Sequence, residues 1–441
     1  MHSDTLREKR RVVAASAIGT TIEWYDFFIF STSAALVFST QFFSALDPAT
    51  ALLASMATLG VTFIARPFGS AITGHYGDRI GRKKMLILTL GVMGTATVAV
   101  GLLPTYQQVG IWAPILLVLM RFLQGFSAGG EWAGAALMAV EHAPQDKRGI
   151  YGSSSQIGTP IGLILANGVF LLMVSVTTDE EFLSWGWRIP FLLSVVLIFL
   201  GFYIRNKVHE SPVFEEMKAT QREARAPLTQ IIREHKRPVA LAAATFLANN
   251  MVGYIFLSFL LSYATNTLGM PRPTMLAIVI GGSFSWLAAI LFSGWVADRI
   301  GGRRIFIIGF GVMLLWCIPF MMLVDTRSVL AISVATTILT VTLGLSYGAQ
   351  SALFASMFPT RVRYSGASLA YAFGAILGGG FAPFIATYLV QRTGSGMSVA
   401  VYMLVMVAIS LVATLMIKPS DMVGLPHGPA STLPTGSGAR S

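Results

Sequence analysis

Cysteine and charged residues are both scarce in this sequence. The single cysteine, Cys317, lies in an apolar run, which excludes an internal disulfide bond and a cysteine-based metal centre. Charged residues make up 12% of the chain, about half of the roughly 25% found in soluble domains. The six histidine residues have no metal-binding spacing, and no nucleophile–base pattern or phosphate-binding loop is present. We therefore expect no metal ion, no cofactor and no enzymatic activity.

The sequence is rich in long apolar stretches. Hydrophobic residues make up 54% of the 441 residues, and the mean hydropathy is +0.68. A transmembrane helix needs about 20 apolar residues. Twelve stretches qualify, at roughly 12–38, 52–75, 85–104, 111–140, 150–176, 188–207, 238–265, 275–297, 305–323, 328–355, 364–391 and 397–418. We predict an all-α membrane protein with twelve transmembrane helices, kinked near 158–162 and at Pro383.

The basic residues are distributed unevenly between the connections. With the N-terminus inside the cell, nearly all of the 31 Lys and Arg residues fall on the inner side or at its edge. The exceptions are Arg188, Arg272, Arg327 and Arg392 on the outer side and Arg66 and Arg121 within spans. Cytoplasmic connections are enriched in Lys and Arg, so we expect both termini to be cytoplasmic. This bias explains the net charge of +11, and we expect a lipid bilayer and no nucleic acid as partner.

A basic, glycine-containing motif occurs twice in the chain. The stretch 74–84 reads GHYGDRIGRKK, and the stretch 294–304 reads GWVADRIGGRR. A second pair, Pro144-x-x-x-Arg148 and Pro359-x-x-x-Arg363, recurs at a similar offset. Two repeats with similar offsets indicate a duplicated half.

The duplication predicts a domain organisation. We expect an N-terminal six-helix bundle at 1–207, a cytoplasmic linker at 208–237 and a C-terminal six-helix bundle at 238–418. The Pro-, Gly- and Ser-rich segment 419–441 is predicted to be a disordered cytoplasmic tail. Because each chain holds both halves, we expect a monomer.

Five ionisable residues lie inside spans of the first half. Glu23 and Asp26 are three residues apart and therefore share a helix face. Arg66 lies in the second span, and Arg121 and Glu131 lie in the fourth. At 1.5 Å per residue, several of them are about 13–16 Å from the inner end of their spans, near the bilayer middle. Such groups are costly in a membrane and are functional by default, although a structural ion pair is the alternative for Arg66.

Three of these residues are acids and two are arginines, which leaves one acid without a cation. A carboxyl group in a low-dielectric environment takes up a proton more readily than one in water, as a proton-coupled carrier requires. We favour Glu131 or Asp26 as the proton site and keep Glu23 as a third candidate. The candidate substrate-binding residues are Arg66, Arg121, Tyr25, Gln124, Gln156, Asn249, Asn250 and Gln350.

Several stretches resemble one family of transporters. The doubled motif, the twelve spans and the central linker resemble the major facilitator superfamily. More narrowly, IEWYDF at 22–27, ARP at 65–67, QGFSAGGE at 124–131 and WGWRIPF at 185–191 resemble the metabolite:proton symporter family. The match covers nearly the whole chain except the tail. The resemblance implies alternating access, in which two six-helix bundles rock about a site near the bilayer middle.

The resemblance also implies a gating role for the doubled motif. Asp78 would lie near the start of the eleventh span, and Arg79 or Arg82 would pair with Glu141. This cluster is expected to hold the cytoplasmic side shut. The full gating set is Gly74, Gly77, Asp78, Arg79, Gly81, Arg82, Glu141, Arg148, Asp298, Arg299 and Arg363.

The second half departs from the first in two ways. Ala297 and Gly302 take the places of Gly77 and Arg82, so we expect a weaker latch in that half. No Lys, Arg or His lies well inside its spans. An anionic substrate would therefore be bound by arginines of the first half and by Asn and Gln side chains of the second.

These observations predict a proton-coupled symporter that imports a small organic anion. The resemblance implies shikimate or a di- or tricarboxylate as substrate, in a bacterial-type inner membrane. One alternative is a carrier of a zwitterion such as proline or betaine, to which Trp24 and Tyr25 would contribute cation–π contacts. The two intramembrane arginines argue against that alternative. A transporter-like sensor is the alternative of another class, and uphill uptake would exclude it.

Overall fold

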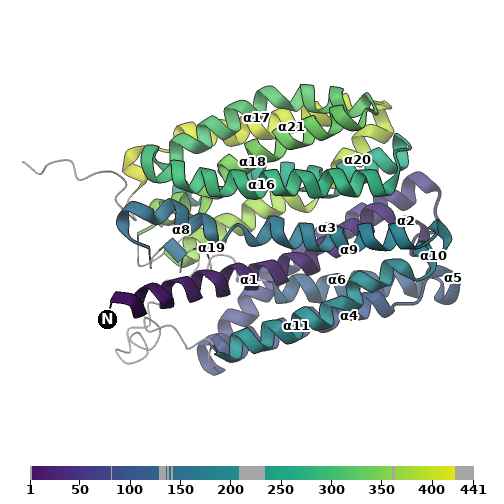
Figure 1. The fold of residues 1–441 in the computed structure, drawn as a ribbon, viewed down its shortest axis with the longest axis horizontal. Coiled ribbons are helices and arrows are strands. Elements are labelled where there is room, and N and C mark those ends of the chain that lie inside the picture. Colours follow the sequence, from purple (N-terminus) through teal and green to yellow (C-terminus); the bar gives the residue numbers. More distant parts are fainter. Residues whose placement is uncertain are drawn as a thin grey trace, which may run out of the picture.

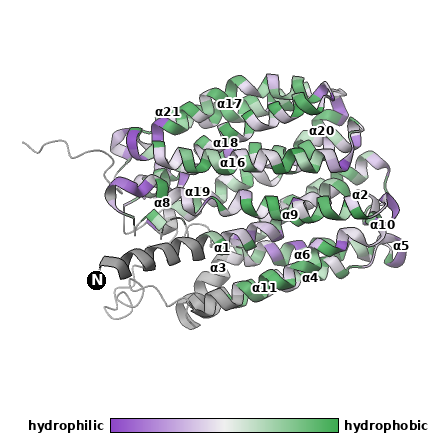
Figure 2. Ribbon diagram, viewed as in Figure 1, coloured by the Kyte–Doolittle hydropathy of each residue, from purple (hydrophilic) through white to green (hydrophobic). Residues whose placement is uncertain are grey.

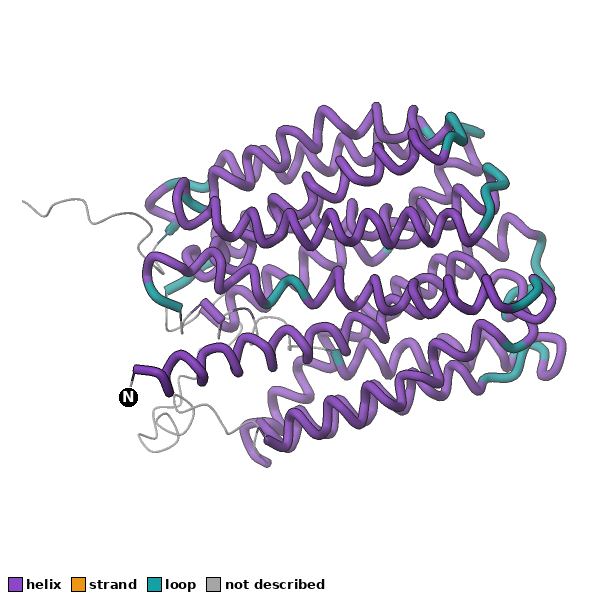
Figure 3. Tube along the Cα trace, in the orientation of Figure 1, coloured by secondary structure: helices purple, strands orange, loops and turns teal. Residues whose placement is uncertain are grey.

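The computed structural model of the chain describes residues 2–80, 82–128, 136, 139–140, 143–207, 234–359 and 363–422. Within these ranges every regular element is a helix (Figure 3). The long helices run along one common direction, with the connections gathered at the two ends (Figure 1). The predicted all-α architecture is confirmed for this part of the chain.

Each predicted span of the first half corresponds to a helix. These are α1 (His2–Leu36), α3 (Pro48–Ile80), α4 (Arg82–Leu102), α6 (Trp112–Ser127), α8 (Arg148–Ser154) continued by α9 (Gly158–Val176), and α11 (Ile189–Lys207). The shorter elements α2 (Phe38–Gln41), α5 (Tyr106–Val109), α10 (Asp179–Ser184), η1 (Gln145–Lys147) and η2 (Gly186–Arg188) lie in the connections.

The second half contains three wide π-helical turns. Its spans are α14 (Lys236–Tyr254) continued by η3 (Ile255–Phe259), α15 (Leu260–Ser262) and η4 (Tyr263–Thr267); α16 (Arg272–Ile300); α17 (Gly302–Asp325); α18 (Val329–Met357); α19 (Arg363–Ala375) continued by η5 (Ile376–Gly380) and α20 (Ala382–Thr393); and α21 (Met397–Met416), followed by the short turn η6 (Pro419–Asp421). The π-helical turns are η3, η4 and η5, in the seventh and eleventh spans. Such turns are rare and are frequent at functional sites.

The helix lengths and compositions fit a membrane. Among the described residues, eight helices are long and apolar enough to cross a bilayer, and three shorter apolar helices cover 87–102, 112–127 and 186–201. The remaining predicted span is α1, which is 35 residues long. Figure 2 shows apolar residues along the middle of the helices and polar residues toward both ends. These helices account for the twelve predicted spans.

Two spans break where the sequence predicts kinks. α8 ends at Ser154 and α9 begins at Gly158, so the fifth span is interrupted just before Pro160. In the eleventh span, Pro383 is the second residue of α20, directly after the break at Phe381. Proline removes a backbone donor and crowds the preceding turn, which explains both positions.

The two halves meet along a few helices. α16 of the second half packs against α8 and α9, while η5 and α20 pack against α3 and η3 packs against α1. In Figure 1, α4, α6 and α11 lie on one side of the molecule and α17, α18 and α21 lie on the other. The segments between them are therefore the ones that must slide if the halves move.

The C-terminal end of the last span is tied down beyond its predicted boundary. The Lys418 backbone N–H donates to Asp421 Oδ2 at 2.8 Å, and Arg237 pairs with Asp421 at 3.4 Å. The predicted start of the disordered tail at 419 is therefore a few residues too early, because Asp421 binds the basic start of α14. Residues 423–441, and 208–233 of the predicted linker, lie outside the described residues.

Candidate functional site

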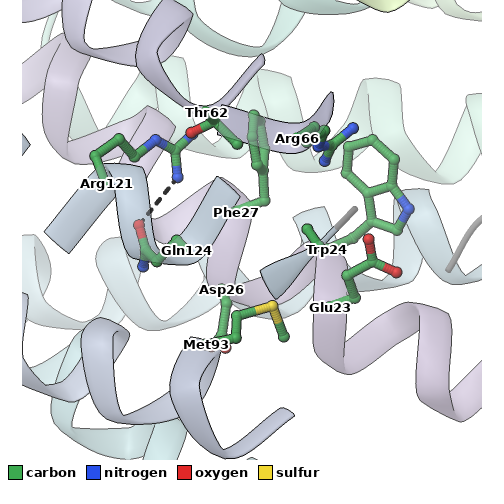
Figure 4. A pocket seen from close by; sticks show the side chains of 10 residues that line it. Glu23, Trp24, Asp26, Phe27, Thr62, Arg66, Met93, Arg121 and Gln124 are labelled. Carbon is green, nitrogen blue, oxygen red and sulfur yellow. Dashed lines mark hydrogen bonds between the residues drawn. The ribbon is translucent and has the colours of Figure 1, made fainter. Parts of the chain in front are cut away.

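A pocket lies among α1, α3, α4 and α6 of the first half. Ten residues line it: Glu23, Trp24, Asp26, Phe27, Thr62, Arg66, Met93, Arg121, Gln124 and Ala128 (Figure 4). Four of the five ionisable residues predicted to lie within spans therefore line one pocket. The fifth, Glu131, lies outside the described residues.

Arg121 is a buried guanidinium with unused donors. Its side chain is 1% exposed. Nη1 donates to Gln124 Oε1 at 3.2 Å, whereas Nε and Nη2 have no hydrogen-bond partner within the described structure. The rings of Phe27 and Phe30 lie 4.4 and 4.0 Å from its Cζ atom, so cation–π contacts hold it. Two N–H groups thus remain to bind an acceptor from a ligand.

Asp26 is a buried carboxyl group in the same pocket. It is 2% exposed, and neither of its oxygen atoms has a hydrogen-bond partner in the part of the chain that is described. The hydroxyl groups of Thr97 and Ser194 lie beside it without hydrogen-bonding geometry. These surroundings disfavour the ionised form of the carboxyl group, because burial of a charge without partners is costly.

A hydrogen-bonded chain leads from Arg121 toward Asp26. Gln124 accepts from Arg121 and donates through Nε2 to Thr97 Oγ1 at 2.8 Å. The Thr97 hydroxyl in turn donates to the Met93 carbonyl oxygen at 2.9 Å. Its proton is therefore engaged elsewhere, and toward Asp26 it offers a lone pair, which suits a protonated carboxyl group.

Arg66 has partners of its own. Its charge interacts with Glu23, and its guanidinium donates to the Tyr371 hydroxyl of the second half. The Phe63 ring lies 5.2 Å from its Cζ atom and the Phe27 ring 5.9 Å. Figure 4 shows Phe27 between Arg66 and Arg121, with Glu23 on the Arg66 side. The structural ion pair of Arg66 with one acid stays a prediction, and Glu23 is the acid whose charge acts on it.

Tyr254 of the second half packs against the pocket wall. Its ring meets Phe27 edge-on at 5.6 Å and Phe63 at 5.5 Å. The residue is 2% exposed, and its hydroxyl has no hydrogen-bond partner among the described residues. On its other side lies Gly379, where an added Cβ would come within 2.8 Å of the ring. Tyr254 directly precedes η3 and Gly379 lies within η5, so both π-helical spans meet here.

Tyr254 was not among the substrate-binding residues predicted from the sequence. It is one aromatic residue among many in an apolar span, and helical periodicity does not distinguish it from a packing residue. The only signal in the sequence is its place in the first span of the second half, which corresponds to the acid-bearing first span of the first half.

The other predicted substrate-binding residues do not line the pocket. Tyr25 donates its hydroxyl to the Pro190 carbonyl oxygen at 2.9 Å and does not line the pocket, so its binding role stays a prediction. Asn249 is bound by Ser346 and Gln350 within the second half. Gln156 is buried at the break between α8 and α9.

Two amide groups of the second half keep unused donors. Asn250 Nδ2 and Gln350 Nε2 have no hydrogen-bond partner in the described residues. Asn250 lies beside Gly379, next to Tyr254. These amides lie outside the pocket, and their predicted role in binding stays a prediction.

The second copy of the motif is helical on either side of a break at Gly301. Residues 74–80 continue α3, and residues 294–300 continue α16 up to Gly301, whose φ is 90°. The helices extend past the apolar core, so the polar motif still completes regular turns. The side chains of Gly74, Gly77, Asp78, Arg79 and Arg82, and all of Gly81 and Glu141, lie outside the description.

Asp298, in the second copy of the motif, joins the two halves. Its carboxylate accepts from the backbone N–H groups of Gly149 and Ile150, the latter at 3.0 Å. These groups open α8, where N–H donors lack intrahelical partners and attract an anion. A Cβ on Gly149 would overlap the carbonyl oxygen of Gly294, so the backbones of α8 and α16 touch at this point. The expected weaker latch in this half stays a prediction, because the first copy has no described side chains.

The remaining predicted gating residues have other surroundings. Arg299 lies 3.4 Å above the half-exposed ring of Trp295, and its gating role stays a prediction. Arg363 is buried and donates through Nε to the Phe358 carbonyl oxygen at 3.4 Å. Arg148 begins α8, one residue before the groups that bind Asp298.

Three contacts join the halves at the end opposite Asp298. Arg272 pairs with Asp179 at 2.8 Å, Gln391 donates to the Ala49 carbonyl oxygen at 3.0 Å, and Asn266 donates to the Ala35 carbonyl oxygen at 3.1 Å. Asp179 begins α10, which is capped by Thr178 and Glu181. The backbone N–H and hydroxyl of Thr178 hold the pKa of Glu181 below its usual range. The halves therefore touch at both ends of the pocket.

Across the described ranges, no three His, Cys, Asp or Glu side chains are close enough to hold a metal ion. Cys317 is buried in α17.

Known proteins resemble the chain over nearly its full length. A family model described as Major Facilitator Superfamily matches residues 16–383. The shikimate transporter of Escherichia coli (strain K12) is 41% identical over 95% of this chain and 96% of its own. An inner membrane metabolite transport protein of the same organism is 40% identical, over 93% and 94%. The proline/betaine transporter of Salmonella typhimurium (strain LT2) is 32% identical, over 93% and 83%.

A solved structure has the same fold. The D-xylose-proton symporter superposes with a TM-score of 0.73 over 95% of this chain and 98% of its own, at 18% identity. The family model, the close relatives and the twelve-helix architecture agree, and the sequence resemblance is confirmed. The chain belongs to the Major Facilitator Superfamily and is a transporter rather than an enzyme.

Proposed function

We propose that this protein is a proton-coupled symporter that imports a small organic anion across a bacterial inner membrane. The observation that carries the proposal is the pairing of Arg121 and Asp26 in one pocket. One is a cation with two unused donors and the other an acid with no hydrogen bonds in the described structure. The names of the metabolite and shikimate transporters support an organic anion as substrate.

The two groups have complementary roles in this proposal. Arg121 binds the carboxylate of the substrate through Nε and Nη2, forming charge-assisted hydrogen bonds that are stronger than neutral ones. Asp26 takes up a proton from the outer side, and the protonated carboxyl group donates to the lone pair that Thr97 presents. Loss of the proton on the inner side restores an uncompensated acid, which disfavours the loaded state and releases the substrate.

Alternating access is supported by the contacts at the two ends. Asp298 holds α16 to α8 on the cytoplasmic side, and Arg272 holds Asp179 on the outer side. In the proposed cycle the halves rock about the pocket, and each set of contacts breaks when its own side opens. Both termini would lie in the cytoplasm.

The test is uptake by purified protein in proteoliposomes. An inward proton gradient is imposed, and labelled shikimate, 2-oxoglutarate, citrate and betaine are offered in turn. Accumulation of an anion above its external concentration, abolished by a protonophore, supports the proposal. Equilibration without accumulation contradicts the proton coupling, and no uptake of any anion contradicts the substrate class.

A zwitterion such as proline or betaine is the second candidate. The aromatic side chains of Trp24 and Phe27 line the pocket, and aromatic faces attract quaternary ammonium groups. Uptake of betaine without uptake of an anion in the same experiment would favour it. Uphill uptake of either compound would exclude a transporter-like sensor.

A further inference from the structure

The two arginines of the pocket are not equally available to a ligand. Arg66 interacts with Glu23 and donates to Tyr371, whereas Arg121 keeps Nε and Nη2 without partners among the described residues. We propose that the site binds a single carboxylate group, on Arg121 alone, and that the substrate is a monocarboxylate carried with one proton. This inference rests on the proposed function and narrows its substrate class.

Phe27 prevents one carboxylate from using both guanidinium groups. Its ring centroid lies 4.4 Å from Arg121 Cζ and 5.9 Å from Arg66 Cζ, and Figure 4 shows the ring between them. A carboxylate binds one guanidinium through two parallel hydrogen bonds, and it is too small to reach around an aromatic ring to a second one. The two cations therefore act as separate sites.

The charges of the pocket residues can balance one bound anion. Its described ionisable residues are Glu23, Asp26, Arg66 and Arg121. Glu23 offsets Arg66, so that with Asp26 ionised the pocket has no net charge. Protonation of Asp26 leaves the charge of Arg121 to be offset by one carboxylate. A second carboxylate would meet Glu23 and a guanidinium that is already engaged, which opposes its burial.

The groups that face Asp26 allow the bound ligand to influence whether Asp26 is protonated. On its own helix the neighbouring ionisable groups are Glu23 and Tyr25, and the facing helices present the hydroxyl groups of Thr97 on α4 and Ser194 on α11. The nearest cation of the pocket with unused donors is Arg121, which reaches Thr97 through Gln124. Glu131 lies outside the described residues, so a Glu131→Gln variant accompanies the test.

Apart from Glu23 and Arg66, the remainder of the substrate meets uncharged side chains. Trp24, Phe27 and Met93 line the pocket beside Asp26, and Thr62 adds a hydroxyl group. Such a wall fits a compact ring or short chain that carries hydroxyl groups and no second charge. This lining separates a hydroxylated monocarboxylate from a citrate-like polyanion.

The electrical response of transport tests the charge count. One proton and one monocarboxylate carry no net charge, so shikimate accumulation in proteoliposomes is expected to stay constant when a valinomycin–potassium diffusion potential is set to zero or to negative inside, at a fixed pH gradient. Stimulation by the negative potential would mean more protons or a zwitterion, and inhibition would mean a multiply charged anion; either overturns the proposal.

Gradient-driven uptake of 2-oxoglutarate or citrate would also overturn the proposal while leaving the proposed symport intact. The same protocol on Glu131→Gln shows whether that acid enters the count: an unchanged neutral response supports the proposal, and a charged response overturns it.

Carboxylate recognition by Arg121 is tested by comparing an acid with its ester. Binding of shikimate and methyl shikimate to the detergent-purified protein is measured by tryptophan fluorescence. The wild type is expected to bind the acid about 10- to 100-fold more tightly than the ester, as a charge-assisted pair implies. Arg121→Gln should bind both equally, and Arg121→Lys should restore part of the preference.

Arg66→Gln is the matched control for the same ratio. If Arg66 is engaged by Glu23 and Tyr371, this variant is expected to keep the preference for the acid even when its overall affinity falls. Equal binding of acid and ester by Arg66→Gln, with the preference kept in Arg121→Gln, would reverse the assignment. Because the ratio is measured within one variant, a general loss of folding does not imitate either result.

Discussion

The two halves of this transporter share a repeated motif but differ in the chemistry of their interiors. The first half holds two acids and two arginines around one pocket. The second half presents hydroxyl, amide and aromatic groups, among them Tyr371 on Arg66 and Tyr254 on the pocket wall. The difference indicates a division of labour, in which the first half carries the charges and the second half closes over them.

The largest difference between the two halves is expected at the proposed proton site, Asp26. Asp26→Asn removes the titratable group while keeping its shape, so transport is expected to become passive. With a gradient of two pH units, one proton per substrate allows about 100-fold accumulation in the wild type, and the variant should only equilibrate. Counterflow exchange of labelled substrate should persist.

Asp325 offers a matched acid in the second half. It accepts from the Tyr263 hydroxyl at 2.7 Å, away from the pocket. Asp325→Asn is expected to keep accumulation near the wild-type level. If it abolished accumulation while Asp26→Asn did not, the assignment of proton chemistry to the first half would be wrong.

The closing role of the second half is tested at Tyr254. Tyr254→Ala loses two edge-on ring contacts, each worth about 0.5–1.5 kcal/mol, so substrate affinity should fall about tenfold. Tyr254→Phe keeps the rings, and because the hydroxyl makes no hydrogen bond in the described structure, its affinity should stay within about twofold. Apparent affinities from initial uptake rates distinguish the two variants. Equal loss in both would assign Tyr254 a role through its hydroxyl instead.

The contact of Asp298 with the start of α8 allows the two copies of the motif to be compared. Asp298→Asn removes the charge at the start of α8, which is worth about 0.3–1 kcal/mol, so transport should slow by about two- to fivefold with affinity retained. Asp78→Asn should slow transport further if the first copy is the stronger latch. Turnover and apparent affinity are measured on both variants, and a larger effect at Asp298 would invert the expected order.

The smallest effect is expected at the outer ion pair. Arg272 and Asp179 are partly or largely exposed, and exposed pairs contribute about 0.2–1 kcal/mol. Arg272→Ala should therefore change the transport rate by less than about fivefold, and added salt should bring wild type and variant together. Restoration by the swapped pair Arg272→Asp with Asp179→Arg would confirm that charge attraction is responsible, and a swap no better than the single variant would contradict it.

The features that were predicted best from the sequence are those that carry a large energetic penalty in a membrane. The twelve spans, their kinks and the presence of Glu23, Asp26, Arg66 and Arg121 inside spans all follow from the penalty on charge and unpaired backbone in an apolar medium. Contacts between distant segments were not predictable. The Asp179–Arg272 pair joins two connections with no common pattern, and each side chain alone is an ordinary exposed charge.

The contacts of individual side chains were also not predictable. Tyr25 donates its hydroxyl to the Pro190 carbonyl oxygen, and Arg299 stacks on the ring of Trp295. The residue type can be read from the sequence, but the direction of the side chain cannot. Direction is set by packing with partners far away in the sequence.

The touching glycines of α8 and α16 have a mechanical consequence. Gly149 and Gly294 let the two backbones touch, with the side chains of Asp298 and Ser153 packed beside the contact. A methyl group at either glycine would push the two helices apart. The absence of a side chain at these two positions therefore sets how closely the halves approach each other at this end.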